Sequence, residues 1–506
     1  MRRSDVFIWI TGLIVLLMAG CSEMDNYSVS PNHRLSFSAD TVSFDTVFTT
    51  VGSTTGYFMI YNRNDMDLKI GRILLANGKE SGFRINVDGR KGDSFNDIPI
   101  WKNDSLFVAV EVTVNPNDEN SPFVIFDSIL FLTNGIIQTV RLEAYGQNAH
   151  ILRGGVTFHQ DTTLTADRPY LVYDSIIVPE NVTLNIEKGA SFHMHNGAKW
   201  LIDGTLKANG TMEEPIVFRG DRLNRFSYYI SYDQLPAQWN GLFFGASSFD
   251  NELVYTSVRN GISGLTFAES TPDRKKMTIH YSQIKNMDGN VLTAENCFIE
   301  AYNSEFSNAS HYLVRLDGGK YQFTHCTMAN YMLGGLMNNS ATRAQKCLTL
   351  TNGTEKRSDE AETKDFPLVQ AFFDNCIIDG NMAADSTKDY QGEIHFLTSE
   401  EEEVLGNDAT FNYRFNHCIV KTKDVINERF TEVLFKKSPT YIKGDGLYDD
   451  NRYDYIFDFR LAEESIGLGQ ADRAIAEEYP TDMYGINRLA SVNGPSIGAY
   501  EFLPRE

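Results

Sequence analysis

The 506-residue sequence has little of several features that mark common classes of protein. Lysine and arginine number 45 against 67 aspartate and glutamate residues, which gives a formal net charge of −22. Such a balance argues against nucleic acid or anionic lipid as the main partner, because both would repel the chain. Proline is scarce, with 14 residues, and 12% of the residues are aromatic. Most of the chain is therefore expected to fold rather than remain disordered.

Motifs for metal binding and nucleophilic catalysis are also missing. The six cysteines include no Cys-x-x-Cys pair, so the spacing of a zinc site is absent. The motif Gly-x-Ser-x-Gly, which marks the sharp turn that presents a nucleophilic serine, does not occur. Because these motifs are absent, the sequence predicts no catalytic residue, no metal ligand and no cofactor.

The N-terminus has the composition of a processing signal. Arg2 and Arg3 precede an apolar stretch, residues 6–18, that is short for a membrane span. It leads into Leu-Met-Ala-Gly-Cys at residues 17–21, which resembles the lipobox of bacterial lipoproteins. The resemblance implies a signal peptide over residues 1–21 and a lipid on Cys21, followed by a polar tether over residues 22–34. An uncleaved membrane anchor with a chance cysteine is the alternative interpretation.

Acidic residues follow Cys21 directly, at Glu23 and Asp25. They resemble the export signal that sends lipoproteins of some Gram-negative bacteria to the outer face of the cell. We therefore expect a lipid-anchored protein of the bacterial outer membrane, displayed at the cell surface. Any solvated tether would have a similar composition, so the membrane leaflet stays open.

The middle of the chain repeats itself with a period of about 22 residues. Residues 291–308 align without a gap on residues 313–330, and further segments fit the same columns. A repeat of this length with strand-like composition buries its apolar side chains only by stacking on the next repeat. The sequence therefore predicts a solenoid, and its strand-like columns favour a parallel β-helix.

Two columns of the repeat have a direct physical interpretation. A small residue alternates with a large apolar residue two positions later, as in a strand that faces a core. Cys326, Cys376 and Cys418 share this small, inward column with serine, so we expect them to serve packing. The residue before it is Asn or His, which suits a tight bend because Asn tolerates left-handed backbone angles. Whether Cys297 and Cys347 form a disulfide stays open.

Residues 35–148 show a different pattern. About seven short alternating strands, separated by turns, occupy about 110 residues and predict a β-sandwich. The segment resembles immunoglobulin-like domains of ciliary and bacterial surface proteins, on residues 56–64, 110–116, 130–134 and 140–146. The resemblance implies a spacer or interaction module without catalytic residues.

Residues 149–440 are predicted to form the β-helix. Residues 183–210 are a run of short alternations broken by glycines, as corners of such a solenoid require. This run resembles the opening rungs of right-handed parallel β-helix proteins, the pectin-lyase-like superfold. Charged segments at residues 354–365, 383–391 and 399–404 interrupt the repeat, and we interpret them as loops that leave the solenoid.

Residues 441–506 resemble the closing segment of surface β-helix proteins, on residues 454–461, 465–469, 482–488 and 497–501. The end of a solenoid exposes open strand edges, which need a cap. We therefore assign Asp482 and Arg488 to capping rather than to a reactive pair. The fold class that follows is all-β, with an N-terminal sandwich, a right-handed parallel β-helix and this C-terminal cap.

An enzyme of the pectin-lyase-like fold would need clustered acidic side chains. Its lyases hold calcium with carboxylates beside a Lys or Arg base, and its hydrolases need converging aspartates. The two outward columns after the small residue are not acidic: they contain Gln283, Glu305, Thr327, Ile377 and Ile419, and Lys285, Ser307, Ala329, Asp379 and Lys421. The one Asp-Asp pair, residues 449–450, lies in a polar stretch typical of a turn. His193 and His195 lie two residues apart and could share a metal, but an exposed pair is the simpler expectation.

The function predicted from these observations is that of a glycan-binding or adhesive surface module without catalysis. Long, rigid faces suit repetitive polymers, and aromatic side chains pack on sugar rings. The alternative is a polysaccharide lyase or glycoside hydrolase that acts on an extracellular glycan from the same face. The expected partners are the membrane, through the lipid, a polysaccharide and another surface protein, with no nucleic acid among them.

Overall fold

The structure is a computed structural model of the chain, and part of the sequence falls outside it. It describes residues 26–226, 230–332, 346–352, 366–384, 392–397, 411–424, 427–444 and 456–503. Cys21, the predicted Asp-Asp turn and the glutamate run lie outside the described residues, as does nearly all of the two other predicted loops. In the described part of the chain, no helix is long and apolar enough to cross a membrane. The chain divides into two compact units, Met1–Asn148 and Ala149–Glu506.

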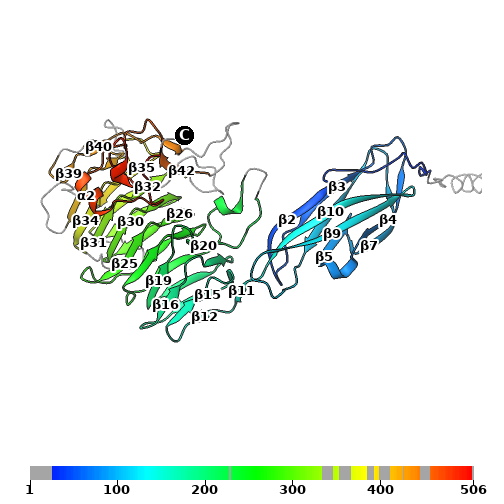
Figure 1. The fold of residues 1–506 in the computed structure, drawn as a ribbon, viewed down its shortest axis with the longest axis horizontal. Helices are drawn as coiled ribbons and strands as arrows, with labels where there is room; N and C mark the ends of the chain where they lie inside the picture. Colours follow the sequence, from blue (N-terminus) through cyan, green and yellow to red (C-terminus); the bar gives the residue numbers. More distant parts are fainter. Residues whose placement is uncertain are drawn as a thin grey trace, which may run out of the picture. The chain divides into compact units, whose positions relative to one another are not determined.

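The N-terminal unit is a β-sandwich of two five-stranded sheets (Figure 1). One sheet has the order β1 (Ser36–Phe37), β3 (Gly56–Tyr61), β8 (Ser105–Val112), β5 (Phe83–Val87) and β6 (Arg90–Gly92). The other has the order β2 (Thr41–Phe48), β10 (Ile136–Gln147), β9 (Phe123–Thr133), β4 (Leu68–Leu75) and β7 (Ser94–Ile100). Strand β2 pairs in parallel with β10, and a short helix, η1 (Gly78–Ser81), precedes β5.

Alternate side chains of both sheets form one buried core, which includes Phe58, Val110, Phe131 and Leu142. This period of two is the reason why the sequence predicted a sandwich, and the prediction of the fold is confirmed. The sequence interpretation found about seven strands and missed β5, β6 and β7.

Part of the predicted tether packs on the sandwich. The Ser28 amide donates to the Asp67 carbonyl at 2.8 Å, and Asn134 Nδ2 donates to the Ser30 carbonyl at 2.9 Å. The Tyr27 ring stacks on Trp101 with 6.3 Å between ring centroids. The described residues before Leu35 are therefore ordered against the domain, in contrast to the predicted free tether.

The C-terminal unit is a parallel β-helix, whose successive rungs lie side by side in Figure 1. Each described turn of the chain adds strands to three long sheets. The eleven-stranded sheet contains β11 (His150–Leu152), β14 (Tyr170–Val172), β17 (Ser191–Met194), β20 (Ile216–Gly220), β23 (Thr256–Arg259), β26 (Gln283–Met287), β29 (Glu305–Ala309), β32 (Thr327–Asn330), β35 (Ile377–Gly380), β38 (Ile419–Val420) and β40 (Leu434–Phe435).

The two other sheets follow the same order of rungs. The nine-stranded sheet contains β12 (Val156–Thr157), β15 (Ser175–Val178), β18 (Lys199–Ile202), β21 (Gly241–Phe244), β24 (Leu265–Phe267), β27 (Leu292–Glu295), β30 (Val314–Asp317), β33 (Leu348–Thr351) and β36 (Ile394–Leu397). The ten-stranded sheet contains β13 (Thr162–Leu164), β16 (Thr183–Ile186), β19 (Thr205–Asn209), β22 (Asn251–Val254), β25 (Lys275–His280), β28 (Phe298–Tyr302), β31 (Gly319–Thr324), β34 (Leu368–Asp374), β37 (Phe411–Asn416) and β39 (Phe430–Thr431). The all-β class and the parallel β-helix are confirmed, and the right-handed sense stays a prediction.

Columns of like residues hold the rungs in register. Phe323 stacks on Phe373 with 5.3 Å between centroids, and Phe373 stacks on Phe415 at 4.8 Å. Cys326, Cys376 and Cys418 form the predicted inward column. The backbone nitrogen of Cys326 lies 3.4 Å from Cys376 Sγ, and that of Cys376 lies 3.4 Å from Cys418 Sγ. All five described cysteines are buried thiols outside any disulfide, so Cys297 and Cys347 are not paired with each other.

The bends between the ten-stranded and eleven-stranded sheets use left-handed backbone. The φ angles are 47° at Asn303, 48° at His325, 53° at Asn375 and 49° at His417. The column of Asn and His therefore serves the bend that the sequence predicted.

The closing segment packs on the side of the solenoid. It contains β41 (Tyr441–Lys443), β42 (Asp458–Leu461), α2 (Arg473–Glu478) and η3 (Arg488–Ala490). Its apolar side chains, among them Phe459, Ile497 and Tyr500, form a buried cluster with Ile377 and Ile419 of the eleven-stranded sheet. The Ala499 amide donates to Thr327 Oγ1 at 3.0 Å, and the Asp472 amide donates to Asn375 Oδ1 at 2.7 Å.

These contacts correct the predicted cap. The closing segment covers the outer face of the sheet along several rungs, whereas the prediction placed it over the terminal strand edges. The cause is in the sheet itself, whose outward residues at β32, β35 and β38 include the apolar Ala329, Ile377 and Ile419, and burying these side chains is favourable.

Arg488 joins this cover to a bend of the solenoid. Its side chain is buried, and Nη2 donates to Asn303 Oδ1 at 2.8 Å while Nη1 donates to the Ser496 carbonyl at 3.2 Å. Burial lowers the pKa of Arg488, against the opposing charges of Glu501 and Asp482. The prediction that Arg488 is structural agrees with these contacts.

Candidate functional site

The outward columns of the eleven-stranded sheet have the register that the sequence predicted. Gln283 pairs with Glu305, Glu305 with Thr327 and Thr327 with Ile377, while Lys285 pairs with Ser307 in the neighbouring column. Because parallel strands lie about 4.8 Å apart, side chains of one column stand next to one another on the surface. The columns are polar up to β29, and beyond it they also contain apolar residues, Ala329, Ile377 and Ile419, that the closing segment covers.

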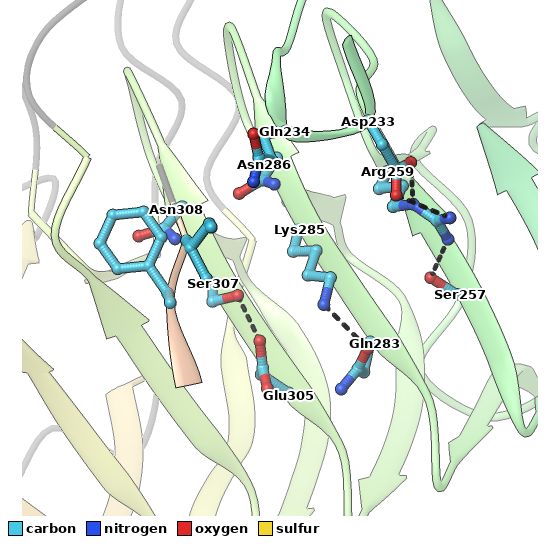
Figure 2. A pocket seen from close by; sticks show the side chains of 12 residues that line it. Asp233, Gln234, Ser257, Arg259, Gln283, Lys285, Asn286, Glu305, Ser307 and Asn308 are labelled. Atoms are coloured by element: carbon cyan, nitrogen blue, oxygen red, sulfur yellow. Dashed lines mark hydrogen bonds and ion pairs between the residues drawn. The ribbon is translucent and has the colours of Figure 1, made fainter. Parts of the chain in front are cut away.

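A polar groove with a volume of about 360 Å³ lies on rungs that the closing segment covers only in part. Its floor consists of outward side chains of β23, β26 and β29, and Figure 2 shows Arg259, Lys285 and Glu305 on these neighbouring strands. One wall is the short helix η2 (Tyr232–Gln234), and the other is Ile456 with Phe457, which directly precede β42 in the closing segment.

A hydrogen-bonded cap fixes the wall at η2. The Ser231 side chain accepts from the Asp233 amide, and the Gln234 side chain accepts from the Ser231 amide at 2.8 Å. These bonds supply acceptors for two backbone N–H groups that the start of a helix otherwise leaves unpaired. The loop therefore holds Asp233 and Gln234 in fixed positions at the edge of the groove.

Asp233 is clamped between two arginines. Arg259 Nε donates to Asp233 Oδ1 at 2.8 Å, and Arg219 Nη2 lies 3.1 Å from the same oxygen. Burial alone would raise the pKa of Asp233, but the charge and hydrogen bonds of Arg259 and the charge of Arg219 outweigh it and lower that pKa. Arg259 Nη1 also donates to Ser257 Oγ at 2.9 Å, so its guanidinium is fixed by hydrogen bonds to both Asp233 and Ser257.

Lys285 stands at the centre of the floor. Its Nζ donates to Gln283 Oε1 at 3.0 Å, and both side chains belong to β26 (Figure 2). The charge of Lys285 contributes to lowering the pKa of Asp233 on one side and of Asp458 on the other. No ion pair of Lys285 occurs within the described residues.

Glu305 is buried at the far end of the floor. It accepts hydrogen bonds from Ser307 Oγ, at 2.5 Å, and from the Tyr500 hydroxyl of the closing segment. Gln283 Nε2 donates to the same Tyr500 hydroxyl at 2.9 Å. The closing segment is thus joined by polar contacts to two floor residues.

Asp458 and Arg460 form an ion pair on β42, next in sequence to the wall residue Phe457. Arg460 Nη2 donates to Asp458 Oδ2 at 2.5 Å, and Arg460 outweighs burial in lowering the pKa of Asp458. The ring of Tyr484, which is 45% exposed, stacks on Tyr500 with 5.6 Å between centroids. This part of the closing segment therefore carries a paired charge and one partly exposed aromatic ring.

The two histidines singled out in the sequence do not form a joint site. His193 is buried, and its Nε2 lies 3.0 Å from Ser191 Oγ, whereas His195 Nδ1 bonds Asp221 Oδ2 at 2.6 Å. The expectation of an exposed pair is wrong for His193, because η2 and the arginines lie near it. Burial first, then the charges of Arg219 and Arg259, lower the pKa of His193 to about 3.

Asp379, the acidic member of the second outward column, lies under the closing segment. Its carboxylate accepts from Tyr331 at 2.6 Å, from Tyr441 at 3.1 Å and from Ser438 at 2.8 Å. Burial raises the pKa of Asp379 against these hydrogen bonds. Within the described residues, no three His, Cys, Asp or Glu side chains gather closely enough to hold a metal ion.

Comparison with known proteins gives distant similarities of fold. No protein-family model and no curated protein matches the sequence. The pectate lyase Pel9A aligns over 70% of this chain and 88% of its own, with 11% identity and a TM-score of 0.31. A PapD-like domain of human CEP192 covers 25% of this chain and 92% of its own length, with 10% identity and a TM-score of 0.16. The E. coli chaperone DraB covers 22% of this chain and 54% of its own, with 11% identity and a TM-score of 0.16.

At such identities and scores, these similarities carry no argument about what this chain binds or does.

The site residues that sequence reasoning missed are Asp233, Gln234, Ile456 and Phe457 in the walls, and Ser257 and Arg259 in the floor. The floor residues had a signal, because Ser257 and Arg259 continue the two outward columns one rung earlier. The wall residues come from an insertion and from the C-terminus, outside the repeat.

Proposed function

We propose that this chain is a lipid-anchored protein of the bacterial outer membrane, attached through Cys21, whose β-helix binds a glycan without cleaving it. The lipobox-like residues at the N-terminus support the anchor and the surface location. The groove on the eleven-stranded sheet supports the glycan. The sandwich serves as a spacer or interaction module between the anchor and the binding domain.

The observation that carries the proposal is the composition of the groove. Its floor presents amide, hydroxyl, guanidinium and ammonium groups on three neighbouring strands, and its wall adds the apolar Ile456 and Phe457. Sugars offer hydroxyl groups at their edges and C–H groups on their faces, so a polar floor beside an apolar wall matches them. Strand-borne side chains that are already hydrogen-bonded lose little conformational freedom when they bind.

We propose binding without catalysis because both carboxylates of the groove already accept hydrogen bonds from neighbouring side chains. A glycosidase needs one carboxylic acid with a raised pKa and a second carboxylate that is free to act. Asp233 has a lowered pKa, which is the wrong direction for a general acid, and Glu305 is held by Ser307 and Tyr500. A lyase is the second candidate, since Lys285 lies in the groove floor and a lysine can act as a general base.

A glycan panel tests the proposal with the whole mature chain, made soluble by Cys21→Ser. Retention of each glycan and the appearance of new reducing or unsaturated ends are both measured. We expect retention of at least one glycan without cleavage. Cleavage that Lys285→Met abolishes would replace the proposal by the lyase.

Blocking variants locate the site. Ser257→Trp places a large side chain on the groove floor, whereas Thr278→Trp adds the same side chain to a half-buried outward position of β25, on another sheet. We expect Ser257→Trp to weaken retention at least tenfold and Thr278→Trp to leave it unchanged, with equal thermal unfolding of both variants. Equal retention by the two variants would show that the glycan binds elsewhere.

A further inference from the structure

We propose that one end of the sandwich rests on the phospholipid headgroups of the membrane that holds the lipid anchor. Aromatic, apolar and basic side chains make the contact, and we call them the aromatic patch: Tyr27, Val29, Lys69, Trp101 and Lys102. The inference rests on the proposed lipid at Cys21 and deepens it, because it adds a second, non-covalent attachment to the first.

The aromatic patch exposes large apolar side chains to solvent. Trp101 is 49% exposed and Val29 is 86% exposed. The Tyr27 ring stacks on Trp101, and Lys69 Nζ lies 4.7 Å from the centroid of the same Tyr27 ring. Tryptophan and tyrosine gather at membrane–water interfaces because their rings are apolar with a polar edge, and lysine extends its ammonium group toward phosphates from an apolar stem. The composition of the patch therefore matches a bilayer surface.

Hydrogen bonds hold the patch in a fixed position. Trp101 directly follows β7, and the Lys102 amide donates to Asp67 Oδ1 at 2.8 Å. The Ser28 amide donates to the carbonyl of the same Asp67 at 2.8 Å. One residue thus ties together the two segments that carry the exposed side chains. Because their backbone is already ordered, little conformational freedom is lost when they meet a surface.

The sequence brings the patch close to the lipid-bearing residue. Tyr27 follows Cys21 by six residues. A chain of this length spans about 20 Å when fully extended. The lipid would place Cys21 at the headgroups, so Tyr27 would lie within about 20 Å of them. So short a connection gives the bilayer a high effective concentration at the patch, and weak affinity is then enough for lasting contact.

Charge does not oppose this contact. The segments that carry the patch, residues 26–34, 62–69 and 101–104, contain four lysines and arginines and three aspartates, which gives a formal charge of +1. The whole chain has a formal net charge of −22, so charge alone would not draw it to a membrane. The nearly balanced patch suits a zwitterionic bilayer, where aromatic and apolar contacts dominate.

Quenching of Trp101 fluorescence on vesicles tests the contact. The chain from Cys21 onward is coupled through the Cys21 thiol to a maleimide lipid, and the five other cysteines are buried, so coupling is specific. The vesicles are phosphatidylcholine, either plain or brominated high in one acyl chain, and bromine quenches tryptophans that reach the interface. Trp200 and Trp239 are buried in the β-helix, and a Trp101→Phe chain supplies their background emission.

A matched pair of variants locates the contact. Val29→Glu places a charge in the patch, whereas Phe126→Glu places the same charge at a 66% exposed position of β9. Strand β9 reaches the patch end of the sandwich at Thr133, which pairs with Ile70, the neighbour of Lys69. Phe126 precedes Thr133 by seven residues, about 24 Å along the strand.

We expect brominated vesicles to lower the emission of Trp101 about twofold relative to plain vesicles. Val29→Glu should remove most of this quenching and Phe126→Glu should leave it, with equal thermal unfolding of both variants. Equal Trp101 emission on plain and brominated vesicles, or equal quenching in the two variants, would overturn the inference and leave the lipid anchor and glycan binding standing. The anchor has its own test, because absence of labelled fatty acid on Cys21 of the full chain in a Gram-negative host would refute the anchor, and the inference with it.

Discussion

The buried His193 makes a specific prediction about stability in acid. Its side chain is 7% exposed, and burial together with Arg219 and Arg259 lowers its pKa from 6.5 to about 3, against the opposing charge of Asp233. A histidine with a lowered pKa contributes stability that is present above pH 6.5 and is lost as the pH falls toward 3. We therefore expect part of the acid sensitivity of the β-helix to originate at this residue.

The magnitude follows from proton linkage. At pH 5 the unfolded histidine is largely protonated, whereas His193 in the folded chain is still neutral. The free energy of unfolding should fall by about 2 kcal/mol between pH 7 and pH 5 because of this one group. In His193→Gln the same interval should lack that loss, because glutamine does not titrate.

Urea unfolding followed by tryptophan fluorescence measures the difference. Trp200 and Trp239 are buried in the β-helix and report its unfolding. We expect the drop in unfolding free energy from pH 7 to pH 5 to be about 2 kcal/mol smaller in His193→Gln than in the parent chain. His159→Gln, at an exposed position, is the control and should behave as the parent does. An equal drop in His193→Gln and the parent would refute the reasoning.

Two further predictions concern the core and the closing segment. Burial raises the pKa of Cys297 to about 11 and of Cys376 well above its usual value, so the native Cys21→Ser chain should not react with a thiol reagent at pH 8. All five thiols should react in urea; rapid reaction of the native chain would contradict their burial. Arg488→Met should destabilise the cover by about 3–5 kcal/mol, because it leaves the buried Glu501 without its cation. Faster proteolysis at Tyr484 would report the loss, and unchanged proteolysis would contradict it.

The sequence predicted the β-helix well because a few fixed positions within each repeat determine the register of its strands. The Asn or His at each bend must accept a left-handed backbone, and the following Cys or Ser must fit between rungs. These constraints act within one repeat and need no knowledge of distant residues. The outward columns, from Gln283 and Lys285 onward, were therefore also correct in register.

Local signals were less informative in the sandwich. The strand Phe83–Val87 and the strand Arg90–Gly92 form a hairpin through Asp88 and Gly89, a turn sequence that favours hairpins. The sequence interpretation passed over this turn. Residues before Leu35 looked like a tether because they are polar, yet backbone hydrogen bonds from Ser28 attach them to the domain. Composition does not reveal such bonds, since the backbone of every residue type except proline can donate them.

The candidate site was only partly predictable, because it depends on where a distant segment stops. Ile377 and Ile419 occupy outward positions, and apolar residues there indicate that another element covers the sheet. The sequence alone does not say which element does so, since the closing segment meets Glu305 and Gln283 through Tyr500, 195 and 217 residues away. The same segment buries the apolar Ile377 and Ile419 and, through Ile456 and Phe457, builds one wall of the groove on the polar rungs before them.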